Sequence, residues 1–283
     1  MLQPWIDSTS AKSLEAELSE AAGMNLAEIS ANASDEELKK TEVAQPLLLA
    51  TALLSWQAFQ ESSDQVQNFS TSAVAGHSVG EFAAAVIVGV LTASDAMSLV
   101  TTRGEAMAEA SEEPKTGMIA VLGGDESEVI EAIERGGVFV ANKNATGQIV
   151  TAGLVTKLDE LSANLPTGCR ARPLAVAGAF HTNYMQSAVD EFAEAAEKIE
   201  FRDPQVTFIS NNAGLELKTG RQIRDHLTNQ IARQVDWVSC QHTFVNLGVT
   251  QMIELAPGNT LSAIARRQIP DIAAHPIASL MPT

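Results

Sequence analysis

The stretch that decides the fold is Ser72-Ala-Val-Ala-Gly-His-Ser-Val-Gly-Glu-Phe-Ala-Ala-Ala-Val-Ile87. It joins a short β run to an alanine-rich helix over 79–90 through the pattern G-x-S-x-G, and in this context the pattern predicts a nucleophile elbow. The sharp turn strains the backbone at Ser78, so small residues, Gly76 and Gly80, must flank it. Outside a strand–turn–helix context the pattern is common by chance and describes a glycine-rich turn with a serine helix cap.

The elbow is expected to place the Ser78 hydroxyl at the start of a helix. Free N–H groups and the positive end of the helix dipole meet there, and both stabilise a negatively charged oxygen. The N–H of Val79 is the predicted donor to such an oxyanion. A serine nucleophile also needs a base that accepts its proton.

Among the five histidines, His181 is the predicted base. It follows Ala-Gly-Ala-Phe at the end of a predicted small inserted domain, where the chain returns to the main domain. It could therefore face a cleft between the two domains. Its position alone is explained equally well by a polar residue that starts a helix. His77 is next to the serine, but the elbow points neighbouring side chains apart. The other three are predicted to be surface residues in polar helices, His226 and His242, or a core residue in the last strand, His275.

Arg103 is the third candidate, and it lies in an otherwise apolar predicted helix. A lone arginine in a helix is usually a solvated surface residue. A buried guanidinium instead requires a carboxylate partner, from the protein or from a substrate.

Periodicity and turn residues divide the chain into two patterns. Over 116–179 the predicted order is βαββαβ, which is typical of a small ferredoxin-like domain. Before and after it, over 1–115 and 180–283, strands and helices predict a second α/β domain with a mostly parallel sheet covered on both faces.

The predicted elements of this α/β fold follow from apolar spacing and helix-capping residues. Helices are predicted over 11–22, 46–60, 79–90, 94–110, 125–135, 155–165, 182–199, 221–231, 237–247 and 261–268. Strands are predicted over 72–76, 118–122, 138–142, 148–152, 170–177, 206–210, 252–255 and 272–278. The predicted helix starts are Pro46 in a first turn, Ser94 or Asp95 as a cap, and Asp125 as a cap.

Composition narrows the class of function. With 18 Lys and Arg against 35 Asp and Glu, the 283-residue chain has a net charge of −17, which argues against nucleic-acid and anionic-membrane partners. No run approaches the roughly 20 apolar residues of a membrane span, and the first residues do not resemble a signal peptide. Cys169 and Cys240 lack metal-site or CxxC spacing, so we expect buried thiols, no metal and a cytoplasmic location.

Together these motifs resemble those of one family, the malonyl-CoA:acyl carrier protein transacylases. Residues 76–82 (GHSVGEF) are similar to its GHSxGE(F/Y) elbow, and 142–153 (NKNATGQIVTAG) to its N-x-N-x-x-G-Q-x-V-x-A-G hairpin. Residues 178–181 (GAFH) are similar to its histidine motif. The C-terminal similarities are Asn211-Asn212, Gln230 before Val235-Asp-Trp237, and Glu254-Leu-Ala-Pro-Gly258 followed by Leu261 and Arg266.

The resemblance implies a fold and a set of roles. The fold is an α/β-hydrolase-like core with a parallel sheet plus an inserted ferredoxin-like small domain. Ser78 is then the nucleophile, His181 the general base and later the acid, and Arg103 the clamp for the malonyl carboxylate. The main-chain carbonyl of Gln230 orients the histidine, and Phe180 narrows the pocket beside the malonyl α-carbon. His77, Asn142 and Asn144 are further pocket residues.

The implied activity is transfer of malonyl from malonyl-CoA to the phosphopantetheine thiol of acyl carrier protein, in fatty acid biosynthesis. The reaction runs through a malonyl-serine ester and needs no metal or organic cofactor. The expected partners are acyl carrier protein and malonyl-CoA, and the expected state is a monomer.

The start of the chain departs from the family pattern. The family's first strand and its P-G-Q-G-S-Q loop have no counterpart before residues 1–5 (MLQPW). We therefore expect that this chain lacks a core strand and one oxyanion donor. Loss of one such donor costs about 2.7–4 kcal/mol, so weak activity and reduced stability are expected.

Two other functions stay open at this point. One is a serine esterase or thioesterase, which predicts a triad carboxylate between the serine and a histidine near the C-terminus. His181 lies far from that end, and Arg103 has no evident role in hydrolysis of a neutral ester. The other is a catalytically weakened relative that binds the carrier protein.

Overall fold

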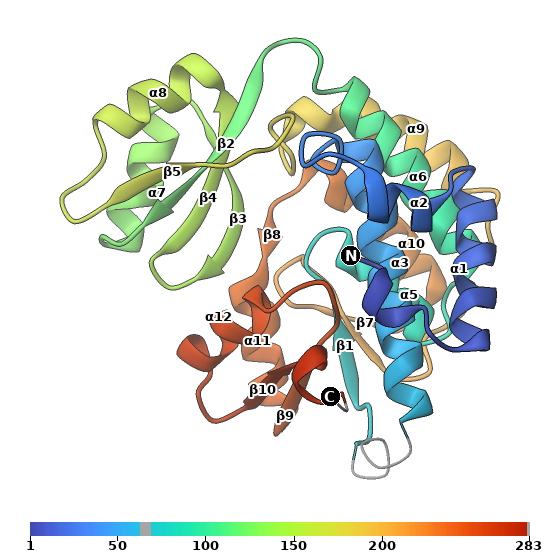
Figure 1. The fold of residues 1–283 in the computed structure, drawn as a ribbon. Coiled ribbons are helices and arrows are strands. Elements are labelled where there is room, and N and C mark those ends of the chain that lie inside the picture. The colour runs from blue at the N-terminus through green and yellow to red at the C-terminus, as the bar shows by residue number, and fades with distance from the viewer. Residues whose placement is uncertain (63–68, 282–283) are drawn as a thin grey trace.

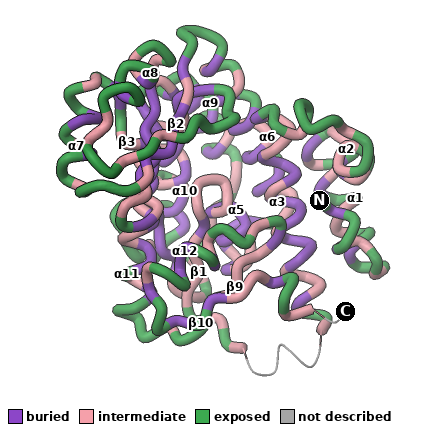
Figure 2. The backbone as a smooth tube through the Cα atoms, turned by 60° about the vertical axis from the view of Figure 1, so that its left-hand side comes forward, coloured by how far each residue is buried: buried purple, intermediate pink, exposed green. Residues whose placement is uncertain are grey.

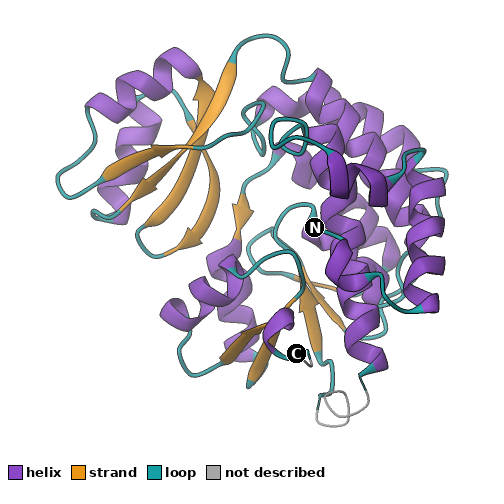
Figure 3. Cartoon of the chain, viewed as in Figure 1, coloured by secondary structure: helices purple, strands orange, loops and turns teal. Residues whose placement is uncertain are grey.

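The computed structural model describes residues 1–62 and 69–281 and is a mixed α/β structure. Most helices pack together beside two small sheets, while a third, larger sheet with its own two helices lies next to them (Figures 1 and 3). The chain enters the larger sheet after α6 and leaves it before α9 (Figure 1).

The helical layer is centred on α3 and α6, whose apolar faces pack against each other and against four other helices. Side chains such as Leu54, Phe82 and Phe192 are fully buried between them. The layer consists of α1 (Thr9–Ala22), α2 (Leu26–Asn32), α3 (Thr41–Glu61), α5 (Gly80–Ile87), α6 (Ala93–Glu109) and α9 (Gln186–Ala196). Figure 2 shows α3 mostly in the colours of buried and intermediate residues, whereas α1 has many exposed ones.

Two predicted helix starts are wrong. Pro46 lies inside α3, because the helix already begins at Thr41, where the buried side chains of Thr41 and Gln45 extend its inner face. The cap of α6 is Thr92, whose hydroxyl accepts a hydrogen bond from the N–H of Asp95. The third start is correct, since Asp125 caps the next helix.

The strands around the elbow form two separate sheets, so the prediction of a single sheet is wrong, although each of the two contains a parallel strand pair. In the first, β1 (Ala73–Ala75) pairs in parallel with β6 (Thr207–Ile209), which pairs antiparallel with β7 (Glu216–Leu217). In the second, β9 (Gln251–Glu254) pairs in parallel with β10 (Ala273–Pro276). Residues of β1 and β9, one strand from each sheet, line a largely apolar cavity of about 350 Å³.

The larger sheet has five strands in the order β5-β2-β4-β3-β8. Apolar side chains alternate between its faces: Ile119 and Val121 face the two helices, whereas Met118 and Ala120 pack toward Ala179. Its elements are β2 (Thr116–Leu122), α7 (Glu126–Arg135), β3 (Phe139–Ala145), β4 (Gln148–Leu154), α8 (Val155–Ala163) and β5 (Arg170–Pro173).

The fifth strand of this sheet comes from a distant part of the chain. β8 (Val235–Asp236) pairs in parallel with β3 through Asn142 and Lys143. The sheet is therefore joined directly to the segment that follows Gln230. Its other face packs against Ala179 and Phe180, the residues just before His181.

The remaining elements complete the layers around the sheets. The predicted helix over 182–199 is divided into a short 3-10 helix, η2 (Asn183–Met185), and the α-helix α9, because the hydroxyl of Thr182 caps η2. The others are η1 (Gln3–Trp5), η2 (Asn183–Met185), α10 (Gly220–Asn229), η3 (Gln230–Ala232), α11 (Trp237–Asn246), α12 (Thr260–Gln268) and η4 (Ile277–Ser279). Within residues 1–62 and 69–281, no helix has the length and apolar character needed to cross a membrane.

Candidate active site

Ser78 lies in a strained turn between β1 and α5. Its φ of 54° is left-handed, a conformation that costs a non-glycine residue about 1–2 kcal/mol. Asn211 fixes the turn from both sides: its Oδ1 accepts from the Ser78 N–H at 2.8 Å, and its Nδ2 donates to the Gly76 carbonyl at 2.6 Å. The Ser78 carbonyl accepts from Gln230 Nε2 at 3.2 Å. These bonds stabilise a backbone that serine alone disfavours.

The two glycines of the elbow differ in their steric role. A Cβ on Gly76 would lie 2.0 Å from the backbone carbon of Gly80, so no larger residue fits there. A Cβ on Gly80 would meet no neighbouring atom within 4 Å. The prediction that both positions must be small is therefore correct for Gly76 and wrong for Gly80.

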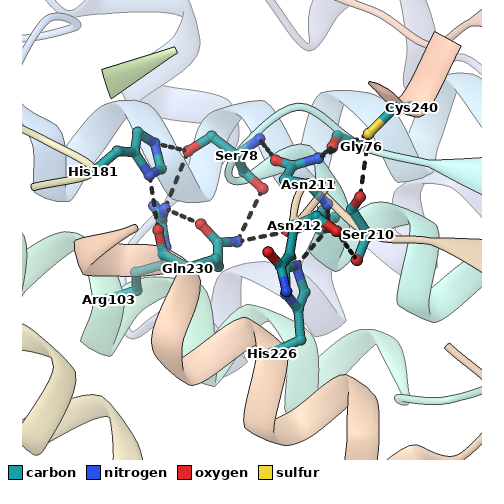
Figure 4. A network of polar contacts seen from close by, with 11 residues as sticks. Gly76, Ser78, Arg103, His181, Ser210, Asn211, Asn212, His226, Gln230 and Cys240 are labelled. Carbon is teal, nitrogen blue, oxygen red and sulfur yellow. Dashed lines mark hydrogen bonds and ion pairs between the residues drawn. The ribbon is translucent and has the colours of Figure 1, made fainter. Parts of the chain in front are cut away.

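The hydroxyl of Ser78 contacts the imidazole of His181. Ser78 Oγ lies 2.7 Å from His181 Nε2, and His181 Nδ1 lies 2.8 Å from the main-chain oxygen of Gln230 (Figure 4). A carbonyl oxygen only accepts hydrogen bonds, so Nδ1 must carry the proton. The lone pair of Nε2 then faces the Ser78 O–H, which is the arrangement that lets a histidine remove the proton of a serine.

The environment of His181 keeps its ring neutral. Burial and the nearby positive charge of Arg103 lower its pKa from 6.5 to about 3, against the opposing effect of the Gln230 carbonyl. The residue itself has a φ of 61°, and its N–H donates to the Ile231 carbonyl at 3.2 Å. The backbone of His181 is thus hydrogen-bonded to the same short segment, 230–231, that orients the Nδ1 atom of its ring.

Arg103 is buried, so its interpretation as a solvated helix residue is wrong. Its side chain is 1% exposed, and Nη2 donates to Ser78 Oγ at 3.1 Å and to Gln230 Oε1 at 3.0 Å. Nη1 donates to Gln45 Oε1, and Nε has no partner in the described part of the chain. No carboxylate of the described residues lies within ion-pair distance of this guanidinium.

The charge of Arg103 persists at neutral pH. Burial lowers its pKa to about 10, and the charge of Glu81 opposes that shift. The site therefore contains a buried cation directed at the reactive serine, with donor capacity that protein groups leave unused. Such a group binds an anionic ligand, and a carboxylate matches its planar geometry.

Among the predicted pocket residues, His77 and Asn144 contact each other. His77 bonds Asn144 Oδ1 through Nε2 at 2.8 Å and lies beside the Trp237 ring, so it points away from Ser78. Burial lowers the pKa of His77, against the effect of that hydrogen bond. Asn142 is buried on β3, and Phe180 is half-buried directly before His181.

The Val79 N–H, the predicted oxyanion donor, follows Ser78 at the N-terminal end of α5. Among the described residues it has no hydrogen-bond acceptor, whereas the next N–H groups bond within the first turn. It is therefore available to a ligand oxygen beside Ser78. The 350 Å³ cavity is a different space, lined by the neighbours of Ser78 and not by Ser78 itself.

Several contacts of the site are absent from the predictions. Gln45 contacts Arg103, and its only signal is a glutamine within an apolar helix. Asn211 and Glu81 belong to recognised motifs, but the motifs gave no sign of their contacts. His226 is wrongly predicted to be a surface residue: its side chain is 10% exposed, and Nε2 lies 2.9 Å from both oxygens of Glu81.

Comparison with known proteins agrees with this geometry. The chain matches the acyl transferase domain family over residues 8–283. It is 43% identical to the malonyl CoA-acyl carrier protein transacylase of Mycobacterium tuberculosis (strain H37Rv) over 279 residues, which is 99% of this chain and 92% of the relative. The chain belongs to the malonyl CoA-acyl carrier protein transacylase family. It is therefore an acyltransferase.

Solved structures of this family have the same fold. The crystal structure of MCAT from Mycobacterium tuberculosis matches with a TM-score of 0.93 and 42% identity, covering 97% of this chain and 90% of that one. A second match is PlMCAT:AntF (holo), a type II PKS acyl-carrier protein in complex with its malonyl-transacylase. It has a TM-score of 0.90 and 30% identity, with coverage of 97% and 90%.

Replacement of Gly76 by Ala is expected to destabilise the fold far more than the same change at Gly80. The new methyl group at 76 clashes with backbone, which costs about 3 kcal/mol, the upper range for overpacking. At Gly80 the methyl group enters open space and favours the helix by up to about 1 kcal/mol. Urea unfolding of the two variants measures the difference. Equal losses of stability would contradict the steric account.

NMR titration of labelled histidines should show His181 neutral well below pH 6, because its pKa is about 3. In the unfolded chain the ring titrates near 6.5, so as the pH falls below 6.5 the unfolded state binds a proton that the folded state does not. The contribution of His181 to stability is thus complete above pH 6.5 and is lost as the pH falls toward 3. Arg103→Met should raise the pH midpoint of the His181 titration, because it removes a nearby positive charge. A His181 midpoint near 6.5 in the unaltered protein would contradict this assignment.

Proposed function

We propose that this chain transfers the malonyl group from malonyl-CoA to the phosphopantetheine thiol of acyl carrier protein, through an ester on Ser78. The observation that carries the proposal is the buried Arg103 guanidinium, which lies 3.1 Å from Ser78 Oγ and forms no ion pair among the described residues. A malonyl thioester supplies both groups that this geometry requires, a carbonyl carbon for Ser78 and a free carboxylate for Arg103.

In the first half-reaction Ser78 Oγ attacks the thioester carbon while its proton moves to His181 Nε2. The carbonyl oxygen becomes negative, and the free Val79 N–H is positioned to donate to it. The tetrahedral intermediate then expels the CoA sulfur, which takes the proton from His181 and leaves as the thiol. The products are free CoA and malonyl-Ser78, and the imidazole is neutral again.

The second half-reaction repeats these steps with the carrier's thiol. His181 Nε2 removes its proton, the thiolate attacks the ester carbon, and Ser78 Oγ leaves with the proton that His181 held. The Gln230 carbonyl keeps Nδ1 protonated throughout, so the basic nitrogen always faces the reacting atoms. Neither half-reaction draws on a metal ion or an organic cofactor.

Arg103 gives the reaction its acyl-group preference. Two parallel hydrogen bonds to the malonyl carboxylate hold the acyl group with its carbonyl at Ser78. Phe180 precedes His181, and its ring would narrow the space beside the malonyl α-carbon. An added methyl group there is disfavoured sterically, which changes rates only moderately. His77, Asn142 and Asn144 would complete the pocket wall.

The fold supports a two-part description of the molecule. We propose an α/β-hydrolase-like core from 1–115 and 180–283 and a ferredoxin-like insert over 116–179, because the insert has the strand order β5-β2-β4-β3 with both helices on one face. β8 joins that sheet from the core. Cys169 and Cys240 are free thiols, which supports the proposal of a cytoplasmic location. We also propose that the protein is a monomer that acts in fatty acid biosynthesis.

Intact-protein mass spectrometry after incubation with malonyl-CoA should detect one malonyl adduct, located on Ser78 by peptide mapping. The adduct should disappear when carrier protein with its phosphopantetheine thiol is added, and Ser78→Ala should form none. Release of free malonate without a carrier would instead identify a hydrolase. Absence of any adduct in the unaltered protein would identify a carrier-protein binder without transferase activity.

Replacement of Arg103 by Ala should abolish the preference for malonyl over acetyl groups. Each charge-assisted hydrogen bond is worth about 1.5–3 kcal/mol, so acylation by malonyl-CoA should slow by about 100-fold or more. Acylation by acetyl-CoA lacks this contact and should change much less. Arg103→Lys keeps the charge but loses the paired geometry and should be intermediate. An unchanged malonyl-to-acetyl ratio of single-turnover rates would refute the carboxylate clamp.

A further inference from the structure

A fully buried carboxylate lies beneath the elbow. Glu81, in the first turn of α5, is 0% exposed and accepts hydrogen bonds from three other segments. The Asn211 N–H donates to Oε1 at 2.9 Å, Gln230 Nε2 donates to Oε2 at 3.1 Å, and His226 Nε2 lies 2.9 Å from both oxygens. Because a carboxylate accepts only, His226 Nε2 must carry a proton. A buried carboxylate is stable only while such donors are present.

Gln230 connects this carboxylate to the reacting groups. Its side-chain amide lies between two opposite charges. Oε1 accepts from Arg103 Nη2 at 3.0 Å (Figure 4), and Nε2 donates to Glu81. This polarity allows only one orientation of the amide. The main-chain oxygen of the same residue accepts from His181 Nδ1 at 2.8 Å. One residue therefore orients both the base and the cation of the site.

We propose that His226 and Glu81 are positioning residues for acyl transfer. His226 on α10 supplies the donor that fixes the Glu81 carboxylate, the carboxylate fixes the amide of Gln230, and Gln230 fixes His181 and Arg103. Neither residue contacts the reacting atoms. The inference rests on the proposed function for its kinetic consequence, whereas its effect on the tautomer of His181 does not depend on that function.

Loss of the His226 donor changes the hydrogen bonds that Glu81 and Gln230 make. Glu81 then has two donors, Asn211 and Gln230, for two oxygens that are both buried. The Gln230 amide is drawn further toward the carboxylate, away from the Ser78 carbonyl, which its Nε2 also contacts at 3.2 Å. Movement of Gln230 weakens the bond to His181 Nδ1 and displaces the acceptor of Arg103.

The surroundings of His226 allow the side chain to be replaced without overpacking. A cavity of about 280 Å³ lies beside it, with Asp225, Asn229, Gln230 and Arg233 among its lining residues. Leucine is close to histidine in volume but has no donor. Glutamine retains an N–H donor on a flexible side chain that can reach Glu81. His242, exposed on α11, provides a matched control position.

The decisive experiment combines two measurements on His226→Leu, His226→Gln and His242→Leu. Nitrogen-15 NMR of labelled histidine reports which ring nitrogen of His181 carries the proton. Single-turnover acylation of Ser78 by malonyl-CoA and acetyl-CoA reports the rates. We expect His226→Leu to convert a single Nδ1-protonated form of His181 into a mixture of tautomers. It should also slow malonyl acylation about tenfold, the lower end of the loss when an orienting partner is removed.

His226→Leu should in addition lower the malonyl-to-acetyl ratio, since Arg103 acts on malonyl alone. A merely structural role would reduce the amount of folded enzyme and scale both rates equally. His226→Gln should restore the tautomer and the ratio, and His242→Leu should match the unaltered protein. If His226→Leu does not fold, Glu81→Gln tests the same link and should give the same mixture of tautomers.

A His226→Leu or Glu81→Gln protein with the unaltered tautomer of His181 and an unaltered malonyl-to-acetyl ratio would overturn the proposal. Failure of the proposed function has a different signature. In that case the unaltered protein forms no malonyl adduct, while the tautomer still responds to replacement of His226.

Discussion

The buried charge of Arg103 is the constraint on which the rest of the site depends. A guanidinium that is 1% exposed must exchange water for protein acceptors, and isolated burial of a charge is very costly. Here its neighbours are neutral oxygens of Gln45, Gln230 and Ser78. They satisfy part of its hydrogen-bonding capacity and none of its charge. The site is therefore prepared for an anion, and burial together with the same positive charge lowers the pKa of His181 and keeps its ring neutral.

A negative charge that balances Arg103 is present, but the side chain of another residue lies between the two charged groups. Glu81 opposes the shift in the pKa of Arg103, yet the Gln230 amide separates the two groups. A direct ion pair would occupy the donors that a substrate carboxylate needs. With an amide between the two charges, the negative charge lowers the cost of burying the cation, and part of the donor capacity of Arg103, Nε included, remains without a partner among the described residues. Because the main-chain oxygen of Gln230 contacts His181, substrate binding and proton transfer in the proposed reaction would share one structural support.

The strain of the elbow is distributed over the same group of residues. Ser78 and His181 both have positive φ, which L-residues adopt only when the surrounding structure compensates. Asn211, at the end of β6, bonds the backbone on both sides of Ser78, and its own N–H donates to Glu81. The parallel pairing of β1 with β6 sets the distance at which these bonds form. The short sheet thus matters less for its area than for the register that it imposes.

Much of this molecule could be predicted from its sequence. The elbow, the order of elements over 116–173 and most helices follow from local patterns, and the resemblance to a family indicated Ser78, His181, Arg103 and Gln230. The errors have physical causes. Pro46 lies inside its helix because buried side chains extend that helix backward, and Thr92 caps α6 because its hydroxyl reaches the N–H of Asp95. The expected single sheet is two separate sheets, and residues of β1 and β9 line a cavity; whether strands far apart in the chain pair with one another is not visible in local patterns.

By itself, the sequence determined the features that depend on residues close together in the chain. These are the glycine that the elbow requires, the spacing of apolar residues in the helices, and the motifs that resemble those of acyl-transfer enzymes. Only the tertiary structure decided what depends on segments far apart in the chain. It buried Arg103 and His226, which local patterns assign to the surface, and it brought Glu81, Asn211 and Gln230 into contact. Burial, pKa and the orientation of an amide arise from surroundings contributed by several segments, and a pattern along one segment cannot specify them.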